Sequence, residues 1–305
     1  MRGKWVLIIL GILVVFAIVS IAGNAKTIYV GPSEKYTSIQ SAIDNATDGD
    51  RIIVRDGIYY EHVKVTKERL TIKSENGSDN CIIDGEGKGI VITLKADRIT
   101  IEGFTIRNST IGIKVFSDSN NIRYNNILNN RDSIYLQGSS NNDILHNNIS
   151  NIWYPEDGYG ILLEESSNNN IAYNRIFEKG IGLRIATLSN KNRITHNNIS
   201  NNWGPAISVI EYSCFNCIEK NNFINNDRDN SIIDNHSVQA FFVLSFQNHW
   251  LRNYWDDWRI ILPRPIFGLG MFIPIPSDSS EPPIALPIPW VNFDWFPAMR
   301  PYSID

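Results

Sequence analysis

The sequence predicts an all-β protein: a right-handed parallel β-helix, in which the chain coils into stacked rungs of short strands. An unusual composition and an internal repeat lead to this fold class. The 305 residues include 48 Ile and 36 Asn. Isoleucine favours packed strands because of its branched Cβ, whereas asparagine favours turns because it tolerates left-handed backbone. The composition therefore indicates many short strands separated by many turns.

The internal repeat is the pattern I-x-x-N-x-I, which recurs six times between residues 120 and 255. A second motif, G-[IL]-x-apolar, fills each period with the alternation of a strand, as at residues 112–115 and 182–185. A period of about 22–24 residues is too short for a strand and a crossover helix, which need about 30. Successive rungs should therefore pair in parallel. Residues 99–104 fit the pattern one period earlier, with Glu102 in place of its asparagine.

The aligned asparagines are expected to lie in one turn, one above another along the helix. Their side chains can bond backbone groups of that turn and each other from rung to rung. We therefore predict a structural ladder made of Asn125, Asn147, Asn174, Asn197, Asn221 and Asn253.

Both ends of such a solenoid need a cap, because open ends expose apolar and unpaired strand groups. At the start, residues 37–40 form a capping-box pattern, which predicts a short helix over residues 38–45. At the end, ten of the 13 Pro lie between residues 263 and 301, and proline disfavours central strands. Residues 259–305 are therefore expected to form an irregular cap, with Trp255, Trp290 and Trp295 mostly buried. Residues 26–258 would be the β-helix itself.

The N-terminal residues 1–25 have the features of an export segment. Arg2 and Lys4 precede an apolar run over residues 5–22, the order typical of a signal peptide. The run is near the minimum length of a membrane span, and small residues suit cleavage after Ala25. A cleaved signal peptide and an N-terminal anchor both remain open; the anchor would make the membrane a partner. Either one places the remainder in an extracellular, cell-surface or periplasmic location.

Charge and sequons agree with an exported protein. The net charge of −4 excludes a general nucleic-acid binder, which needs a strongly basic face. Six N-x-[ST] sequons predict surface glycosylation; they lie at Asn45, Asn76, Asn108, Asn148, Asn198 and Asn235.

The rungs resemble those of the NosD-type periplasmic proteins, which are grouped with carbohydrate-binding and sugar-hydrolysing (CASH-type) β-helices. The opening is similar as well, in residues 27–30, 37–45, 49–50 and 57–61, and residues 253–258 and 292–298 resemble closing segments of archaeal members. The resemblance covers residues 27–258 and implies the fold. It specifies no activity, because relatives include lyases, hydrolases, isomerases and proteins without catalysis.

Catalytic groups on this fold occupy outward strand positions, which here are expected at residues 91, 114, 135, 162, 184 and 208. None of these is a carboxylate, whereas glycoside hydrolysis needs two and a calcium-dependent lyase needs an acidic cluster and a base. The alternative to a non-catalytic protein is a lyase or hydrolase of acidic polysaccharide. Glu156 and Asp157 would be the best source of a missing acid. The alternative catalytic set consists of Glu164, Arg184, Tyr135 and Lys114.

The family name raises copper handling as a lesser alternative. Copper carriers need clustered Met, Cys or His. His146 and His196 occupy equivalent places two rungs apart, which is too far for them to share one ion. Cys214 and Cys217 form a CxxC, but no second pair completes a zinc site. We therefore expect no metal site and no cofactor.

One column along the helix is rich in aromatic and cationic groups. It contains Tyr124, His146, Tyr173 and His196, followed by Lys220 and Arg252. Such groups can bind sugars, although a variable turn position would give the same pattern. The sequence therefore favours an exported, non-catalytic surface protein that binds or displays, with extracellular polysaccharide as its expected partner. The column is a candidate ligand site, and a variable turn position is the simpler explanation of its pattern.

Overall fold

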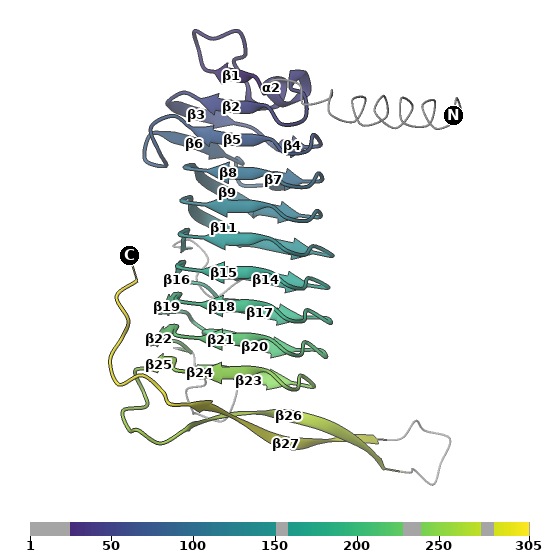
Figure 1. Cartoon of the computed structure of the whole chain (residues 1–305), viewed down its shortest axis with the longest axis vertical. Helices are drawn as coiled ribbons and strands as arrows, with labels where there is room; N and C mark the ends of the chain where they lie inside the picture. The colour runs from purple at the N-terminus through teal and green to yellow at the C-terminus, as the bar shows by residue number, and fades with distance from the viewer. Residues whose placement is uncertain (1–24, 151–157, 228–238, 276–283, 305) are drawn as a thin grey trace, which may run out of the picture.

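The computed structural model describes residues 25–150, 158–227, 239–275 and 284–304, without the side chains of residues 270–288. The described residues form a parallel β-solenoid of about nine turns with one short helix at its N-terminal end (Figure 1). The expected signal or anchor and the acids Glu156 and Asp157 lie outside the described residues. In the described part, no helix has the length and apolarity needed to cross a bilayer.

Three faces of parallel strands run along the solenoid. Face 1 contains β1 (Thr27–Val30), β2 (Arg51–Val54), β5 (Thr71–Ser74), β8 (Thr100–Glu102), β10 (Asn121–Arg123), β12 (Asp143–Leu145), β15 (Asn170–Ala172), β18 (Arg193–Thr195), β21 (Cys217–Glu219) and β24 (His249–Leu251).

Faces 2 and 3 share two long strands, β9 (Thr105–Val115) and β11 (Asn126–Gln137), which run from one face into the next. Face 2 also contains β3 (Gly57–Tyr60), β6 (Cys81–Asp84), β13 (Asn148–Ser150), β16 (Arg175–Phe177), β19 (Asn198–Ser200), β22 (Asn222–Ile224) and β25 (Tyr254–Trp255). Face 3 also contains β4 (Val63–Val65), β7 (Ile90–Leu94), β14 (Tyr159–Glu164), β17 (Ile181–Ala186), β20 (Ile207–Ile210) and β23 (Ala240–Val243).

Stacked isoleucines fill the interior. The central residue of each short face 1 strand points inward and pairs with its equivalent in the next rung, as Ile122 does with Ile144 and Ile144 with Ile171. All three are fully buried. Burial of each such side chain contributes about 1.5–3 kcal/mol, so the repeat of isoleucine is the main source of cohesion between rungs.

The predicted asparagine ladder lies at the corner between faces 1 and 2. All six members are buried, and the Nδ2 of each donates to the Oδ1 of the next, at 3.0–3.1 Å. The same Oδ1 also accepts the backbone N–H of the preceding asparagine, as Asn197 does for Asn174 at 3.0 Å. Asparagine suits this corner because its short side chain carries both donor and acceptor.

A second ladder, which the sequence analysis did not identify, lies at the corner between faces 3 and 1. Its asparagines are also buried and bonded from Nδ2 to Oδ1, at 2.9–3.1 Å. A buried serine precedes each by three residues, so the pattern S-x-x-N was the available signal. The members are Asn120, Asn142, Asn169, Asn192, Asn216 and Asn248.

Helix α2 (Ile39–Asn45) covers the first rung, close to the predicted span, and buries Ile39, Ala42 and Ile43. Its N-cap is Ser38, whose side chain accepts from the backbone N of Ser41. The backbone N–H groups of residues 39 and 40 are bound by the carboxylate of Glu61, at 2.8 and 2.9 Å. Glu61, in the connection between β3 and β4, therefore completes the cap that the sequence pattern placed within residues 37–40.

The C-terminal cap is more regular than the sequence indicated. Strands β26 (Arg264–Ile275) and β27 (Ile284–Trp295) form a long antiparallel hairpin that extends past the last rung (Figure 1). Only two residue pairs join it to β23 and two to β24. Its prolines are tolerated because each strand of a two-stranded hairpin has one side that donates no ladder hydrogen bond.

The tryptophans of this region divide between core and surface. Trp255 is fully buried, as expected, but Trp290 and Trp295 are each 52% exposed, so the prediction that they are buried is wrong. The hairpin presents Ile266 and Asp294, at 1% and 0% exposure, to the solenoid. Since side chains alternate along a strand, the residues next to Asp294 point away from the last rung.

Asp294 ends the first asparagine ladder and should make stability depend on pH. Its Oδ2 accepts the backbone N–H of Asn253 at 3.0 Å and the indole N–H of Trp255 at 2.7 Å. Burial nevertheless raises its pKa to about 6. Because this folded-state pKa exceeds the unfolded value, the stabilisation is complete below pH ~4 and is lost as pH rises through about 6.

We expect the free energy of unfolding to fall by on the order of 2–3 kcal/mol over this interval. Urea denaturation at several pH values would measure it, and Asp294→Asn, which cannot ionise, should flatten the profile. An equally steep profile in the variant would contradict the assignment to Asp294.

Candidate functional site

The predicted aromatic column forms a continuous stack at the corner between faces 1 and 2. Each ring residue directly precedes a ladder asparagine and has left-handed backbone, with φ between 54° and 58°. This conformation turns the side chain outward while the asparagine turns inward. Adjacent rings are parallel within 15°, and their centroids are 5.0, 4.9 and 5.1 Å apart. The structure therefore brings together Tyr124, His146, Tyr173 and His196.

This stacking leaves few ring faces open to a ligand. Internal rings cover one another, so only their edges reach solvent, as a line of alternating hydroxyl and imidazole groups. At the C-terminal end, the ring of Tyr302 meets His196 edge-on at 6.3 Å. Burial and the nearby Lys220 ammonium lower the pKa of His196.

The segment that carries Tyr302 closes this end of the column. The backbone N–H of Tyr302 donates to Oδ1 of Asn222, and the carbonyl of Tyr302 accepts from Nδ2 of the same asparagine, each at 2.9 Å. Its hydroxyl donates to the carbonyl of Arg252 at 2.7 Å. Lys220 is paired with Glu219 at 3.2 Å. The two cations expected to extend the column therefore lie beyond its closed end.

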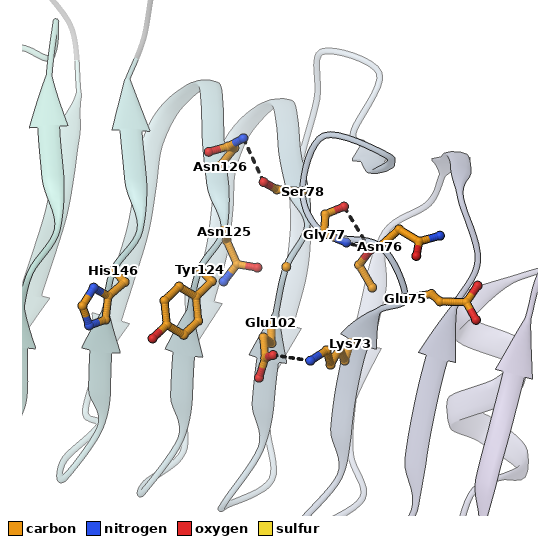
Figure 2. A pocket seen from close by; sticks show the side chains of 12 residues that line it. Lys73, Glu75, Asn76, Gly77, Ser78, Glu102, Tyr124, Asn125, Asn126 and His146 are labelled. Carbon is orange, nitrogen blue, oxygen red and sulfur yellow. Dashed lines mark hydrogen bonds and ion pairs between the residues drawn. The ribbon is translucent and has the colours of Figure 1, made fainter. Parts of the chain in front are cut away.

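The other end of the column opens into a cleft of about 600 Å³. Gly103 takes the ring position one rung before Tyr124, with φ of 77°, and its missing side chain leaves the outer face of Tyr124 uncovered. Tyr124 is 54% exposed. Figure 2 shows Tyr124 and His146 at one side of the cleft and the loop of Asn76 at the other.

The register corrects the expected alignment of residues 99–104. Ile101 pairs with Ile122, so Phe104 and Gly103, not Glu102, align with the ladder asparagine and the ring. Phe104 is fully buried, and its backbone N–H donates to Oδ1 of Asn125 at 3.0 Å. The repeat pattern was thus displaced by two residues at this rung, which concealed the gap in the ring column.

The floor of the cleft carries an ion-pair network. Glu102 binds Lys73 at 2.7 Å and Arg123 at 2.8 Å, across neighbouring face 1 strands. Burial works to raise the pKa of Glu102, but the two cations outweigh it and lower the pKa. The network therefore remains charged at neutral pH and supplies polar groups of both signs beneath the open ring.

The far wall of the cleft is the loop between β5 and β6. Oγ of Ser74 bonds both the N–H and the carbonyl of Gly77, at 3.1 and 3.0 Å. Asn126 donates to Oγ of Ser78 at 3.0 Å, and Thr105 donates to its carbonyl at 2.8 Å. These bonds fix the loop against face 2, so the wall is preformed.

The alternative catalytic set lies on face 3, where Lys114 and Tyr135 are paired in register. The hydroxyl of Tyr135 donates to Glu164, and the Lys114 ammonium lies 4.4 Å from the centre of the Tyr135 ring. Arg184 donates to the hydroxyl of Tyr159 at 3.0 Å. Burial, and next the bond to Glu164, raise the pKa of Tyr135. Tyr135 therefore stays protonated at neutral pH, which is unfavourable for a general base.

Three expected outward positions on face 3 are buried instead. Val91 and Ser208 are both 0% exposed and Leu162 is 6% exposed, and the register aligns Thr93, rather than Val91, with Lys114. Face 3 therefore presents fewer side chains to solvent than the sequence pattern indicated.

The fold and these columns define a parallel β-helix of stacked, asparagine-bonded rungs. The family described as "Periplasmic copper-binding protein (NosD)" matches residues 43–258, and the chain belongs to this family. A cell surface glycoprotein of Methanothermus fervidus is 42% identical over 113 residues, which are 36% of this chain and only 18% of that longer protein. Both matches support an extracellular or surface location.

Solved structures share the architecture at low identity. The alginate lyase of Paenibacillus sp. str. FPU-7 superposes with a TM-score of 0.51 and 17% identity, over 75% of this chain and 95% of the lyase. The DFA-IIIase of Arthrobacter chlorophenolicus A6 gives 0.50 and 15%, over 76% and 81%. At these identities the likeness shows the fold alone.

Proposed function

We propose that this protein binds polysaccharide at the cell surface without catalysis, and that the cleft beside Tyr124 is the binding site. One observation carries the proposal: a tyrosine face is left open where Gly103 interrupts a column of stacked rings. A flat aromatic face beside a few fixed polar groups is the usual make-up of a small-ligand site. A sugar ring would occupy the place of the missing ring.

The surroundings of Tyr124 supply the remaining contacts of such a site. Lys73, Glu102 and the loop amides can bind sugar hydroxyl groups on the floor and far wall. Along the column, the ring edges of His146 and Tyr173 offer hydrogen-bonding groups at intervals of about one rung. A chain of sugars leaving the cleft would therefore find polar partners along the corner.

Replacement of Tyr124 by alanine should weaken polysaccharide binding about tenfold or more, because the stacking face is lost. Tyr212→Ala is the matched control, since Tyr212 is also left-handed, with φ of 60°, and is 57% exposed outside the cleft. Glycan arrays would identify a ligand, and titration calorimetry would then compare the variants. Equal affinities in both variants would contradict this site.

A second variant tests the gap itself. Gly103→Tyr should fill it with one more ring, because four later rungs already hold tyrosine or histidine here with left-handed backbone, at φ of 54–58° compared with 77° at Gly103. The variant should fold and lose binding. Unchanged binding would place the ligand elsewhere.

The enzyme alternative predicts a different result. Turnover of an acidic polysaccharide, measured by the absorbance of unsaturated product and abolished by Glu164→Gln, would replace the binding proposal. The closed contacts of Tyr135, Glu164 and Arg184 favour binding over turnover.

The copper function in the family description does not fit the described residues. None of them form a group of three or more His, Cys, Asp or Glu that could hold an ion. The rings of His146 and His196 are separated by Tyr173. Cys217 and His249 are paired in register, which offers one thiol and one imidazole, fewer than the three ligands of a His₂Cys copper site. We therefore assign no step to copper.

A further inference from the structure

The structure divides the sequons by accessibility. Asn148 and Asn198 begin face 2 strands that are paired on both sides, and the Oδ1 atoms of both are buried. Nδ2 of Asn108 donates at 2.9 Å to Asp84, a buried carboxylate that also binds Arg107. A glycan on Asn108 would displace this bond to Asp84, and Asn148 and Asn198 are half-buried in their strands. Asn235 lies outside the described residues.

Two sequons remain on the surface. Asn45 is the last residue of α2, and its Nδ2 donates at 2.8 Å to the carbonyl of Ser41 within the helix. Asn76 lies in the loop between β5 and β6, next to Gly77 with φ of 90°. Nδ2 of Asn76 donates to both carboxylate oxygens of Asp56, each at 3.1 Å, and this contact is exposed. The contacts of both amides are exposed and therefore weak, so both sequons are available, and Asn76 is the one that lines the cleft.

We propose that Asn76 is an N-glycosylation site and that its glycan borders the sugar-binding cleft. In the reaction, Nδ2 of Asn76 attacks C1 of a lipid-phosphate-linked oligosaccharide donor. The new Nδ2–C1 bond replaces the bond from C1 to the phosphate oxygen, the amide loses one proton, and the lipid phosphate leaves. Ser78 supplies the sequon hydroxyl, two residues after the modified amide.

The position of Asn76 gives this glycan a consequence for the cleft. Asn76 lines the cleft across from Tyr124, at the rim shown in Figure 2. The loop is fixed to face 2 through Ser78, so the first sugar would be held at the rim. It would compete with external polysaccharide for the open ring face; this competition rests on the proposed function, whereas the modification does not.

Glycopeptide mass spectrometry tests the modification directly. The full chain would be produced in an archaeal host that N-glycosylates its own surface proteins, with one of those proteins as positive control. We expect the peptide of Asn76 to carry a glycan, and Asn76→Gln and Ser78→Ala each to abolish it. Asn45→Gln should leave it unchanged. An unmodified Asn76 peptide beside a modified host protein would overturn the proposal.

Polysaccharide binding tests the second part. Glycosylated protein should bind several-fold more weakly than the unmodified wild-type chain produced in a host that lacks N-glycosylation. Equal binding would show that the glycan does not cover the cleft, even where mass spectrometry finds it. If no form binds polysaccharide, the proposed function fails, while the glycopeptide result stands on its own.

Discussion

Replacement of Asn197 by alanine should lower the free energy of unfolding by about 2–4 kcal/mol, because several buried groups lose their partners together. Oδ1 of Asn197 accepts both the backbone N–H and Nδ2 of Asn174, at 3.0 Å each. Its Nδ2 donates to the carbonyl of Ile171 at 2.8 Å and to Oδ1 of Asn221 at 3.0 Å. Alanine would interrupt the ladder in the middle. The polar atoms that Asn197 binds would remain buried, where water cannot replace the lost hydrogen bonds.

Urea denaturation of the purified chain would measure this effect, with Asn80→Ala as the control. Asn80 is exposed and its side chain makes one hydrogen bond, to the carbonyl of Asn76 at 3.1 Å, so removal of that side chain should cost less than about 0.5 kcal/mol. Comparable losses in the two variants would mean that the ladder adds little to stability.

Replacement of Trp255 by alanine should have the largest effect, about 3–5 kcal/mol, because it opens a cavity under the C-terminal cap. The fully buried ring packs 4.4 Å from Phe223 and 3.9 Å below the guanidinium of Arg264. Its indole N–H also donates to the buried carboxylate of Asp294. The variant therefore removes apolar packing and a hydrogen bond to a buried acid at the same time.

Trp290→Ala is the matched control for this variant. Trp290 lies in the same cap but is 52% exposed, so its removal should cost about 1 kcal/mol or less. A stability loss in Trp290→Ala as large as that in Trp255→Ala would show that the hairpin is held mainly by its outer face.

Parts of the candidate site could be predicted because they depend on spacing alone. A column at one corner follows once each rung has the same length between ring residue and ladder asparagine, as for Tyr124 with Asn125 and Tyr173 with Asn174. Whether those rings leave a face open could not be predicted. The spacing between rungs stacks the rings on each other and covers their faces. The open face of Tyr124 depends on Gly103, and the pairing of Ile101 with Ile122 was needed to place Gly103 beside Tyr124.

The cleft wall and the C-terminal cap lay beyond sequence patterns for another reason. The loop of Asn76 faces Tyr124 although 48 residues separate Ser78 from its partner Asn126, and no local pattern encodes that contact. Proline suggested an irregular cap, but the hairpin needs only half of its backbone groups to pair. The burial of Trp255 and the exposure of Trp290 then depend on which side of that hairpin faces the last rung.

The sequence by itself therefore determined the parallel β-helix, because rung length, inward isoleucine and corner asparagine repeat in the chain and each acts through local geometry. The N-terminal helix was predicted for the same reason. Only the tertiary structure decided the open face of Tyr124, the closure of the column by Tyr302, the pairing of Tyr135 with Glu164 and the difference between Asn76 and Asn148. These features are contacts between residues far apart in the chain, and their existence depends on the register and stacking of whole rungs.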